Sequence, residues 1–300
     1  MLEKRPSFKN ARRYLEPAFF IAPAFVVLIG ILIYPLGYSL WLSFHEWTLR
    51  TFRAGIPFIG FENYKELLSS PEFINAITTT LIFMAGAITL EFILGMGLAL
   101  LLDTDLKGKR FYRSMILIPL MCTNVVIGLT WRLLYNYEYG VINYLLNQVG
   151  VDSVGWLSDP AVVMPAVILV DVWNTTSFVA LLLLAGLQSM PEEPFEAARI
   201  DGAGALQRFC FLTLPLLRPT IVVTLLWRVI DTFRIFDVIY LLTGGGPARL
   251  TETVSIYIYR YGFKTFNLGF ASAASFLMIL IMLVIAFFLA RLIGRAVIED

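Results

Sequence analysis

Charged side chains are scarce in this sequence. Asp, Glu, Lys and Arg make up only 15% of the 300 residues, while hydrophobic residues make up 58%. Soluble globular domains carry roughly a quarter charged residues, so this composition excludes an ordinary water-soluble domain and places the chain in a lipid bilayer. The formal net charge is only +1. No basic face is available to neutralise phosphates, and we therefore expect no nucleic acid partner.

Cysteine and histidine are scarcer still. The two cysteines, Cys122 and Cys210, lie far apart, and the single histidine, His45, follows an apolar run beside two tryptophans. This pattern excludes a disulfide framework and a Cys/His metal site. A membrane enzyme would need His, Asp, Glu or Cys side chains gathered at one membrane face. We therefore expect no catalytic residues, no metal and no cofactor bound by this chain.

What the sequence does contain is long apolar runs. A helix of about 20 apolar residues spans the hydrocarbon core of a bilayer. We therefore predict an all-α integral membrane protein with six transmembrane helices, in a single transmembrane domain of residues 18–293 between an N-terminal segment, 1–17, and a tail, 294–300. The predicted spans are approximately Ala18 to Phe44, Ala76 to Leu102, Ser114 to Leu134, Val162 to Gly186, Pro219 to Thr243 and Leu268 to Ile293.

The positive charges are unevenly divided between the loops. Fourteen Lys and Arg residues fall in the N-terminal segment, the second-to-third and fourth-to-fifth loops and the tail, and seven fall in the opposite loops. Cytoplasmic loops carry the excess of positive charge. We therefore expect both termini in the cytoplasm.

Four ionisable residues lie within the spans: Glu91, Asp171, Arg228 and Asp231. Such residues are costly in a membrane and face a partner or a wet cavity. Helical spacing places Arg228, Asp231 and Thr232 on one face of the fifth span, where they could bind a polyhydroxylated or an anionic solute. The same spacing would also allow an internal Arg228–Asp231 ion pair that makes both charges tolerable. The sequence leaves both interpretations open.

The loop between the fourth and fifth spans, residues 189–219, has the pattern of a cytoplasmic helix-turn-helix. Ser189 can cap a first helix that ends where Gly202 and Gly204 permit a left-handed stop. We predict a second short helix from Ala205 to about Leu214, after which Pro215 and Pro219 turn the chain into the fifth span.

The letters of this loop, EAARIDGAGALQRFCFLTLPLLRP, resemble the EAA loop of permease subunits of binding-protein-dependent ABC importers, which has the form E-A-A-x-x-D-G-A. The segments PFIGFENYKELLSSPEF, LLLLAGLQSMPEE and FDVIYLLTGGGPARLTETVSIYIYRYGF are similar to the sugar-importing branch of that family. The resemblance covers residues 18–291, and the relatives that it points to are permeases for maltose, trehalose and glycerol phosphate.

The resemblance implies a permease that moves a sugar or sugar-like solute inward across a prokaryotic cell membrane. Its implied partners are a second permease, identical or different, two cytoplasmic ATPase subunits that bind ATP and Mg, and an extracytoplasmic solute-binding protein. The EAA helix would dock on an ATPase subunit. The implied coupling residues are Glu196, Ala197, Ala198, Asp201 and Gly202. The substrate-path residues, from the resemblance and from the helical spacing, are Asn174, Thr175, Phe178, Arg228, Asp231 and Thr232.

An alternative function is that of a secondary transporter or channel for a small polar solute. Such proteins often contain inverted repeats, and we find no internal repeat. The glycine-rich segment TGGGPARLTE does not match a phosphate-binding P-loop, since no G-x-x-x-x-G-K-[ST] pattern occurs in the chain. We expect a tight turn there, and ATP must be bound by another chain.

Overall fold

The computed structural model describes residues 20–104 and 107–298. Regular structure within these ranges is helical, apart from an isolated bridge between His45 and Phe58. The predicted N-terminal segment 1–17 lies outside the described residues. The described residues form two compact units, one made of residues up to 69 with 261–277 and the other of residues from 70 to 260 with those after 277. Each is described by itself.

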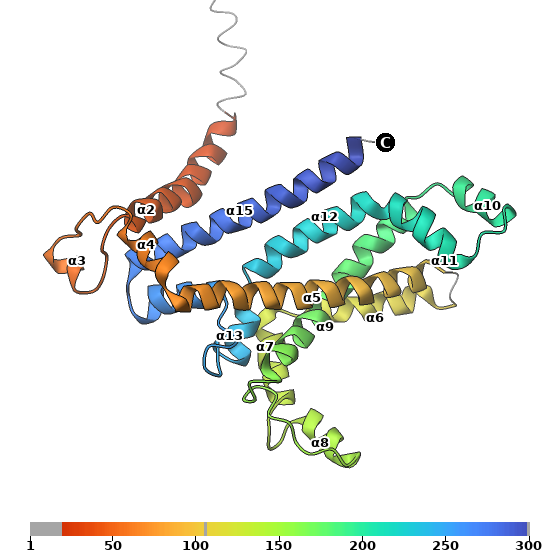
Figure 1. Cartoon of the computed structure of the whole chain (residues 1–300), viewed down its shortest axis with the longest axis horizontal. Coiled ribbons are helices and arrows are strands. Elements are labelled where there is room, and N and C mark those ends of the chain that lie inside the picture. Colours follow the sequence, from red (N-terminus) through yellow and green to blue (C-terminus); the bar gives the residue numbers. More distant parts are fainter. Residues whose placement is uncertain (1–19, 105–106, 299–300) are drawn as a thin grey trace, which may run out of the picture. The chain divides into compact units, whose positions relative to one another are not determined.

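The helices follow one another in the order shown in Figure 1. Within the described part of the chain, five helices are long and apolar enough to cross a membrane, or six if one bent pair counts as a span. The predicted fold class is thereby confirmed. The elements are η1 (Ile29–Ile33), α2 (Tyr34–Ser43), α3 (Thr51–Ala54), α4 (Glu62–Ser69), α5 (Pro71–Asp103), α6 (Lys109–Met121), α7 (Asn124–Leu134), α8 (Val141–Gln148), α9 (Val163–Gln188), α10 (Glu193–Ile200), α11 (Ala205–Arg208), η2 (Phe209–Thr213), α12 (Leu214–Phe233), α13 (Asp237–Leu242), α14 (Val254–Tyr259), η3 (Arg260–Lys264) and α15 (Leu268–Ile298).

In the first unit, short polar contacts hold the segment after α2 in place. Asn63 Nδ2 on α4 donates hydrogen bonds to the carbonyl oxygens of Ser43 (2.9 Å) and His45 (3.1 Å). Gly269, at the start of α15, lies directly against the His45 carbonyl, where a side chain would collide. This unit therefore depends on a close backbone approach that only glycine permits.

The second unit is built on α5 and α9, which lie side by side (Figure 1). Ser70 caps α5, since its Oγ accepts a hydrogen bond from the Phe73 backbone nitrogen at 3.4 Å, and Pro71 occupies the first turn. With 33 residues, α5 is about 50 Å long. It is therefore longer than the roughly 30 Å hydrocarbon core, and its ends extend beyond it.

Two apolar clusters pack along α5 and α9. One contains Phe83 and Ala87 of α5 with Val167 and Val170 of α9. The other combines α5, α9 and α12 and contains Ala99, Leu102, Val179, Leu183 and Leu217. On α5, Glu91 lies between the residues of these two clusters.

The predicted third span is not a single straight helix. Its two halves, α6 and α7, meet at 92° around Cys122 and Thr123, which are both extended. Pro119 lies three residues before the break and has no backbone N–H to donate. The apolar composition predicted the span, but the bend was missed.

The predicted start and end of the fifth span were wrong. Helical structure runs without a break from Ala205 to Phe233, so Pro215 and Pro219 lie inside the helix and do not end it. A wide turn, η2, comes just before Pro215, and within it the Leu214 N–H bonds to the Phe209 carbonyl. The helix then ends at Phe233, and the predicted last residues of the span form the separate helix α13.

Candidate functional site

Arg228 is the centre of a buried ionic cluster that joins α5, α9 and α12. Its Nε and Nη2 donate to the two carboxylate oxygens of Glu91, both at 2.6 Å. Nη2 also donates to Asp171 Oδ2 at 2.8 Å, and Nη1 donates to Asp231 Oδ2 at 3.0 Å. We call these four residues the Arg228 cluster. All three guanidinium nitrogens are occupied by protein carboxylates.

The Arg228 cluster is almost completely shielded from solvent. Arg228 is 1% exposed, Glu91 0% and Asp171 6%. Asp231 lies at the edge, where its second oxygen accepts a hydrogen bond from the exposed Arg234 at 3.3 Å. The predicted Arg228–Asp231 ion pair therefore exists, but it is one part of a larger cluster. The other ionisable residues that the sequence analysis placed within the spans therefore all contact Arg228.

A glycine on α5 allows this convergence. A Cβ built on Gly95, one turn beyond Glu91, would lie 2.8 Å from Val179 Cγ1 and 3.2 Å from the Ala180 backbone nitrogen. Cβ atoms do not approach other atoms so closely, so any larger residue would push α5 and α9 apart. The close contact keeps Glu91 and Asp171 within reach of one guanidinium group.

The other predicted substrate-path residues lie on α9 and α12, a few residues along the chain from Asp171 and Arg228. Thr175 and Thr232 are buried, while Asn174 and Phe178 are half-buried. Within the described residues, the buried Asn174 Oδ1 and Thr232 Oγ1 atoms have no hydrogen-bond partner. The Phe178 ring packs on the Trp227 ring, with 4.1 Å between centroids. This arrangement places unsatisfied polar atoms and aromatic surface on α9 and α12.

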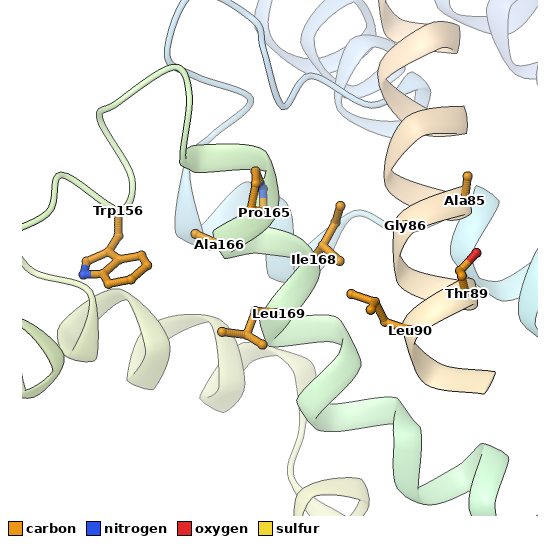
Figure 2. Close-up of a pocket in the computed structure, with 9 residues that line it drawn as sticks. All are labelled: Ala85, Gly86, Thr89, Leu90, Trp156, Pro165, Ala166, Ile168 and Leu169. Atoms are coloured by element: carbon orange, nitrogen blue, oxygen red, sulfur yellow. The ribbon is translucent and has the colours of Figure 1, made fainter. Parts of the chain in front are cut away.

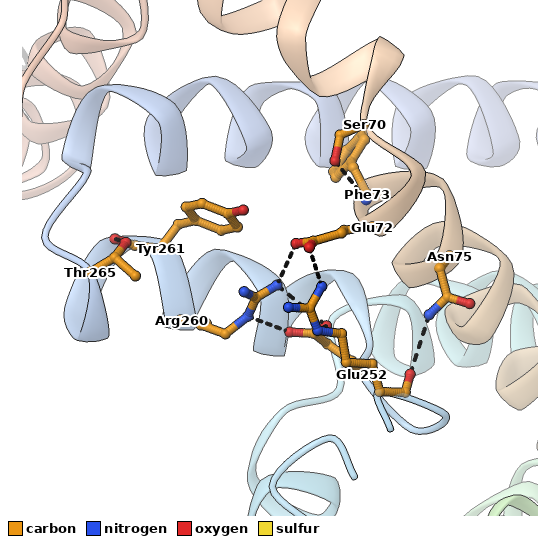
Figure 3. Close-up of polar contacts among 9 residues, drawn as sticks. Ser70, Glu72, Phe73, Asn75, Glu252, Arg260, Tyr261 and Thr265 are labelled. Carbon is orange, nitrogen blue, oxygen red and sulfur yellow. Dashed lines mark hydrogen bonds and ion pairs between the residues drawn. The ribbon is translucent and has the colours of Figure 1, made fainter. Parts of the chain in front are cut away.

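A second ionic cluster lies at the beginning of α5 (Figure 3). Glu72 binds both Arg249 and Arg260, at 3.3 Å from Arg260 Nη2. Arg260 Nε also donates to Glu252 Oε1 at 2.7 Å. We call these four residues the Glu72 cluster. It ties α5 to the glycine-rich segment and to the end of α14. No pattern in the sequence could have paired Glu72 with arginines so distant in the chain.

The glycine-rich segment is an ordered turn before α14. The Thr243 and Thr251 hydroxyls are 2.7 Å apart, and Thr251 Oγ1 donates to the Gly246 carbonyl at 2.7 Å. Asn75 on α5 donates to the Arg249 carbonyl at 3.2 Å. These bonds hold Ala248 and Arg249 in left-handed conformations, with φ of 45° and 66°. The expected turn is therefore present, and a helix follows it.

The predicted coupling residues form α10 and the turn after it. Glu196 and Ala197 are exposed on α10, and Ala198 is half-buried. Asp201 ends the helix, and Gly202 adopts a left-handed φ of 77°. Gly204, which we expected to share this role, is extended instead, and its N–H donates to Gln207 Oε1 at 2.8 Å.

Two further features of this segment differ from the sequence analysis. Ser189 does not cap α10, because it ends α9 and its Oγ donates to the Gly186 carbonyl at 2.8 Å. The large apolar side chains of Ile200, Leu206 and Phe211 are exposed by 87%, 75% and 76%. Ile200 lies one turn after Glu196 on α10, so an exposed apolar side chain accompanies the exposed carboxylate there.

Open pockets adjoin α5 and α9 in the described part of the chain. The first, of about 660 Å³, is lined by apolar side chains such as Leu90, Ile168 and Leu169, together with Thr89 (Figure 2). The second, of about 630 Å³, shares Leu169 and extends to Trp173 and Ser177. The third, of about 530 Å³, lies against α10 and is polar. Its lining includes Asp103, Glu192, Glu196, Arg199 and Thr213.

Comparison with known proteins decides the family. Residues 91–299 match the family described as the binding-protein-dependent transport system inner membrane component. This chain belongs to that family. It is 41% identical over 263 residues to the trehalose/maltose transport system permease protein MalF of Thermococcus litoralis, covering 88% of each chain. It is also 41% identical to the trehalose transport system permease protein SugA of Mycobacterium tuberculosis, over 92% of this chain and 88% of the relative.

A solved structure agrees with this membership. The chain matches a chain in the crystal structure of a bacterial ABC transporter involved in the import of the acidic polysaccharide alginate, with a TM-score of 0.82 and 26% identity. The match covers 96% of this chain and 98% of the other. The chain is thus a multi-pass permease subunit of an ABC importer, in a family of subunits that are not themselves ATPases. The resemblance inferred from the EAA letters is confirmed, and the secondary-transporter alternative is not favoured.

Proposed function

We propose that this permease carries a neutral sugar or sugar-like solute inward across the cell membrane. Its partners would be a second permease, two cytoplasmic ATPase subunits that bind ATP and Mg, and an extracytoplasmic binding protein. The names of two relatives support a sugar as the solute, since those proteins are named for the transport of trehalose or maltose. The excess of Lys and Arg in alternate loops supports cytoplasmic termini.

The observation that carries the solute class is the pair of buried polar atoms without partners, Asn174 Oδ1 and Thr232 Oγ1. Buried polar atoms are nearly always hydrogen-bonded, and a sugar hydroxyl can donate to both kinds of oxygen. Phe178 lies one turn from Asn174 on α9 and adds an aromatic face. Together with Thr175, these residues would form this chain's side of the solute path.

The contacts of Arg228 support a neutral solute. Each nitrogen of its guanidinium group already donates to a carboxylate of this chain, and the group is 1% exposed. Arg228 is therefore not available to an anionic solute. Of the two charged path residues predicted from sequence, only the half-buried Asp231 would reach the path, where a carboxylate accepts hydrogen bonds from neutral hydroxyls and repels anions.

The test is solute-stimulated ATP hydrolysis by the complete reconstituted complex with its binding protein. Trehalose and maltose should stimulate hydrolysis, whereas alginate oligosaccharides should not. Stimulation by the anionic oligosaccharides alone would contradict a neutral solute.

A substitution at Thr232 tests the role of its hydroxyl, which has no hydrogen-bond partner within the described residues. Thr232→Val should reduce transport severalfold, because it removes a hydrogen bond to solute while keeping the shape of the side chain. Thr224→Val on the same helix is the matched control. Its hydroxyl is equally buried but already donates to the Thr220 carbonyl at 2.8 Å. Equal transport losses in the two variants would remove Thr232 from the path.

We also propose that α10 docks on an ATPase subunit and transmits its movement. Glu196 would pair with a basic residue of the ATPase, Ala197 and Ala198 would permit close approach, and Asp201 and Gly202 would set the bend after the helix. The exposure of Glu196 and of the apolar side chain of Ile200 supports this surface.

Charge reversal tests this surface. Glu196→Lys should abolish solute-stimulated ATP hydrolysis and weaken co-purification with the ATPase, while the permease still folds. Glu138→Lys is the control, because Glu138 is equally exposed but lies in the segment between α7 and α8. Normal transport by Glu196→Lys with its ATPase bound would show that the docking assignment is wrong.

A further inference from the structure

The Arg228 cluster contains more negative than positive charge. Asp231 is shared between Arg228 and the exposed Arg234, so Arg234 can balance it at the edge of the cluster. This leaves Glu91 and Asp171, both buried, against one buried guanidinium group. With both carboxyl groups ionised, the interior would hold one uncompensated negative charge.

The position of this charge makes it costly. Glu91 lies 19 residues beyond Glu72 on α5, about 28 Å along the helix, and apolar clusters pack on both sides of it along α5 and α9. An unpaired charge buried in such surroundings costs several kcal/mol. A metal cation is not indicated, because the described residues contain no group of three or more His, Cys, Asp or Glu side chains that could hold one.

The contact between the two carboxyl groups supplies the second observation. Glu91 and Asp171 both accept hydrogen bonds from the same nitrogen, Arg228 Nη2, at 2.6 and 2.8 Å. Because both carboxyl groups bond to this one nitrogen, they lie next to each other in the apolar interior. Two ionised carboxylates cannot bond to each other, since neither has a hydrogen to donate. Neighbouring carboxyl groups in an apolar site can share one proton, because ionising both would bury two like charges side by side.

We propose that the Glu91–Asp171 pair is a proton-binding site in the interior of the permease. One carboxyl group keeps its proton and donates it to the other, and the remaining carboxylate balances Arg228. The charged groups that face the pair are Arg228 of α12 and, through it, Asp231 and Arg234. The buried network that holds the three helices together then carries no net charge, since one carboxylate remains to balance the guanidinium group.

Infrared spectroscopy of the assembled complex in lipid nanodiscs tests the proposal directly. At neutral pH the wild type should show the carbonyl stretching band of a protonated carboxylic acid, and the band should shift in D₂O. Glu91→Gln and Asp171→Asn should each remove it, because an amide replaces the protonated group and can donate the same hydrogen bond. Glu72→Gln, in the second ionic cluster, should leave the band unchanged. A wild-type band that survives both amide variants, or no such band at all, would overturn the proposal.

Thermal denaturation supplies a second readout. If the folded chain holds a proton that the unfolded chain releases, the melting temperature must fall as the pH rises and the proton is lost. Either amide variant should flatten this dependence, since the amide has no proton to lose over that range. Asp171→Asn provides the same test if Glu91→Gln fails to fold. An unchanged slope in a folded amide variant would count against the site.

Discussion

The two ionic clusters of this permease are built from the same residue types but on different principles. The Glu72 cluster contains two carboxylates and two arginines. The side chains of Glu72 and Arg249 are 39% and 44% exposed, while Glu252 is 4% exposed and lies between both arginines. The Arg228 cluster sets three carboxylates around one buried arginine. Both lie along α5, one at its beginning and the other near its middle.

The two clusters differ in how far their charged side chains are exposed to solvent, and this exposure determines how the charges are stabilised. Where water can reach, each charge is solvated and the pairs contribute little to stability. In the apolar interior every charge must be balanced. Removing one partner leaves the other charge buried and uncompensated, which is strongly destabilising. We therefore expect equivalent substitutions in the two clusters to have very different effects.

The largest effect should follow removal of the central arginine. Arg228→Met leaves Glu91 and Asp171 buried without a counter-charge, and we expect a loss of about 3–5 kcal/mol, seen as low yield and a lower melting temperature of the complex. Arg249→Met in the Glu72 cluster is the matched control and should cost at most about 1 kcal/mol.

Removing one of the carboxylates should restore part of this loss. In Glu91→Gln/Arg228→Met, the remaining Asp171 can stay neutral, so the double variant should be more stable than Arg228→Met alone. Equal losses for Arg228→Met and Arg249→Met would mean that burial does not distinguish the two clusters.

A smaller effect should follow from forcing α5 and α9 apart. Gly95→Ala would place a Cβ 2.8 Å from Val179, and the overpacking should cost about 1–3 kcal/mol in the thermal stability of the complex. Val179→Ala in the same chain should relieve it. Gly97→Ala, where a Cβ meets no atom within 4 Å, should be neutral or slightly stabilising. A Gly97 variant as unstable as the Gly95 variant would point to helix flexibility instead of packing.

The sequence predicted the membrane spans well, because a bilayer demands long apolar helices wherever the chain crosses it. It failed where the local backbone departs from a straight helix. The 92° bend at Cys122 and the uninterrupted helix through Pro215 depend on backbone turns that composition does not encode. We expected Pro215 to end the helix. Instead the π-helical segment η2 precedes it, and the helix continues through Pro215.

The sequence predicted the residues of the candidate site but not most of the contacts between them. Glu91, Asp171, Arg228 and Asp231 were identified because ionisable side chains are costly within a membrane span. Only the contact between Arg228 and Asp231 could be predicted, from their i, i+3 spacing on one helix. The other contacts depend on how α5, α9 and α12 pack, which a single sequence does not determine. For the same reason the exposed Ile200 could not be distinguished from a buried residue.

The smallest expected effect concerns salt. Glu72→Gln removes one partner from two part-exposed arginines and should cost up to about 1 kcal/mol at low ionic strength. Because the Debye length falls from about 10 Å at 0.1 M to about 3 Å at 1 M, this cost should nearly disappear in concentrated KCl. Replacing Arg228 should cost the same at both salt concentrations, since ions do not enter the apolar interior. Melting temperatures of both variants in the two salts measure the difference, and a salt-sensitive Arg228 variant would show that water and ions reach the buried cluster.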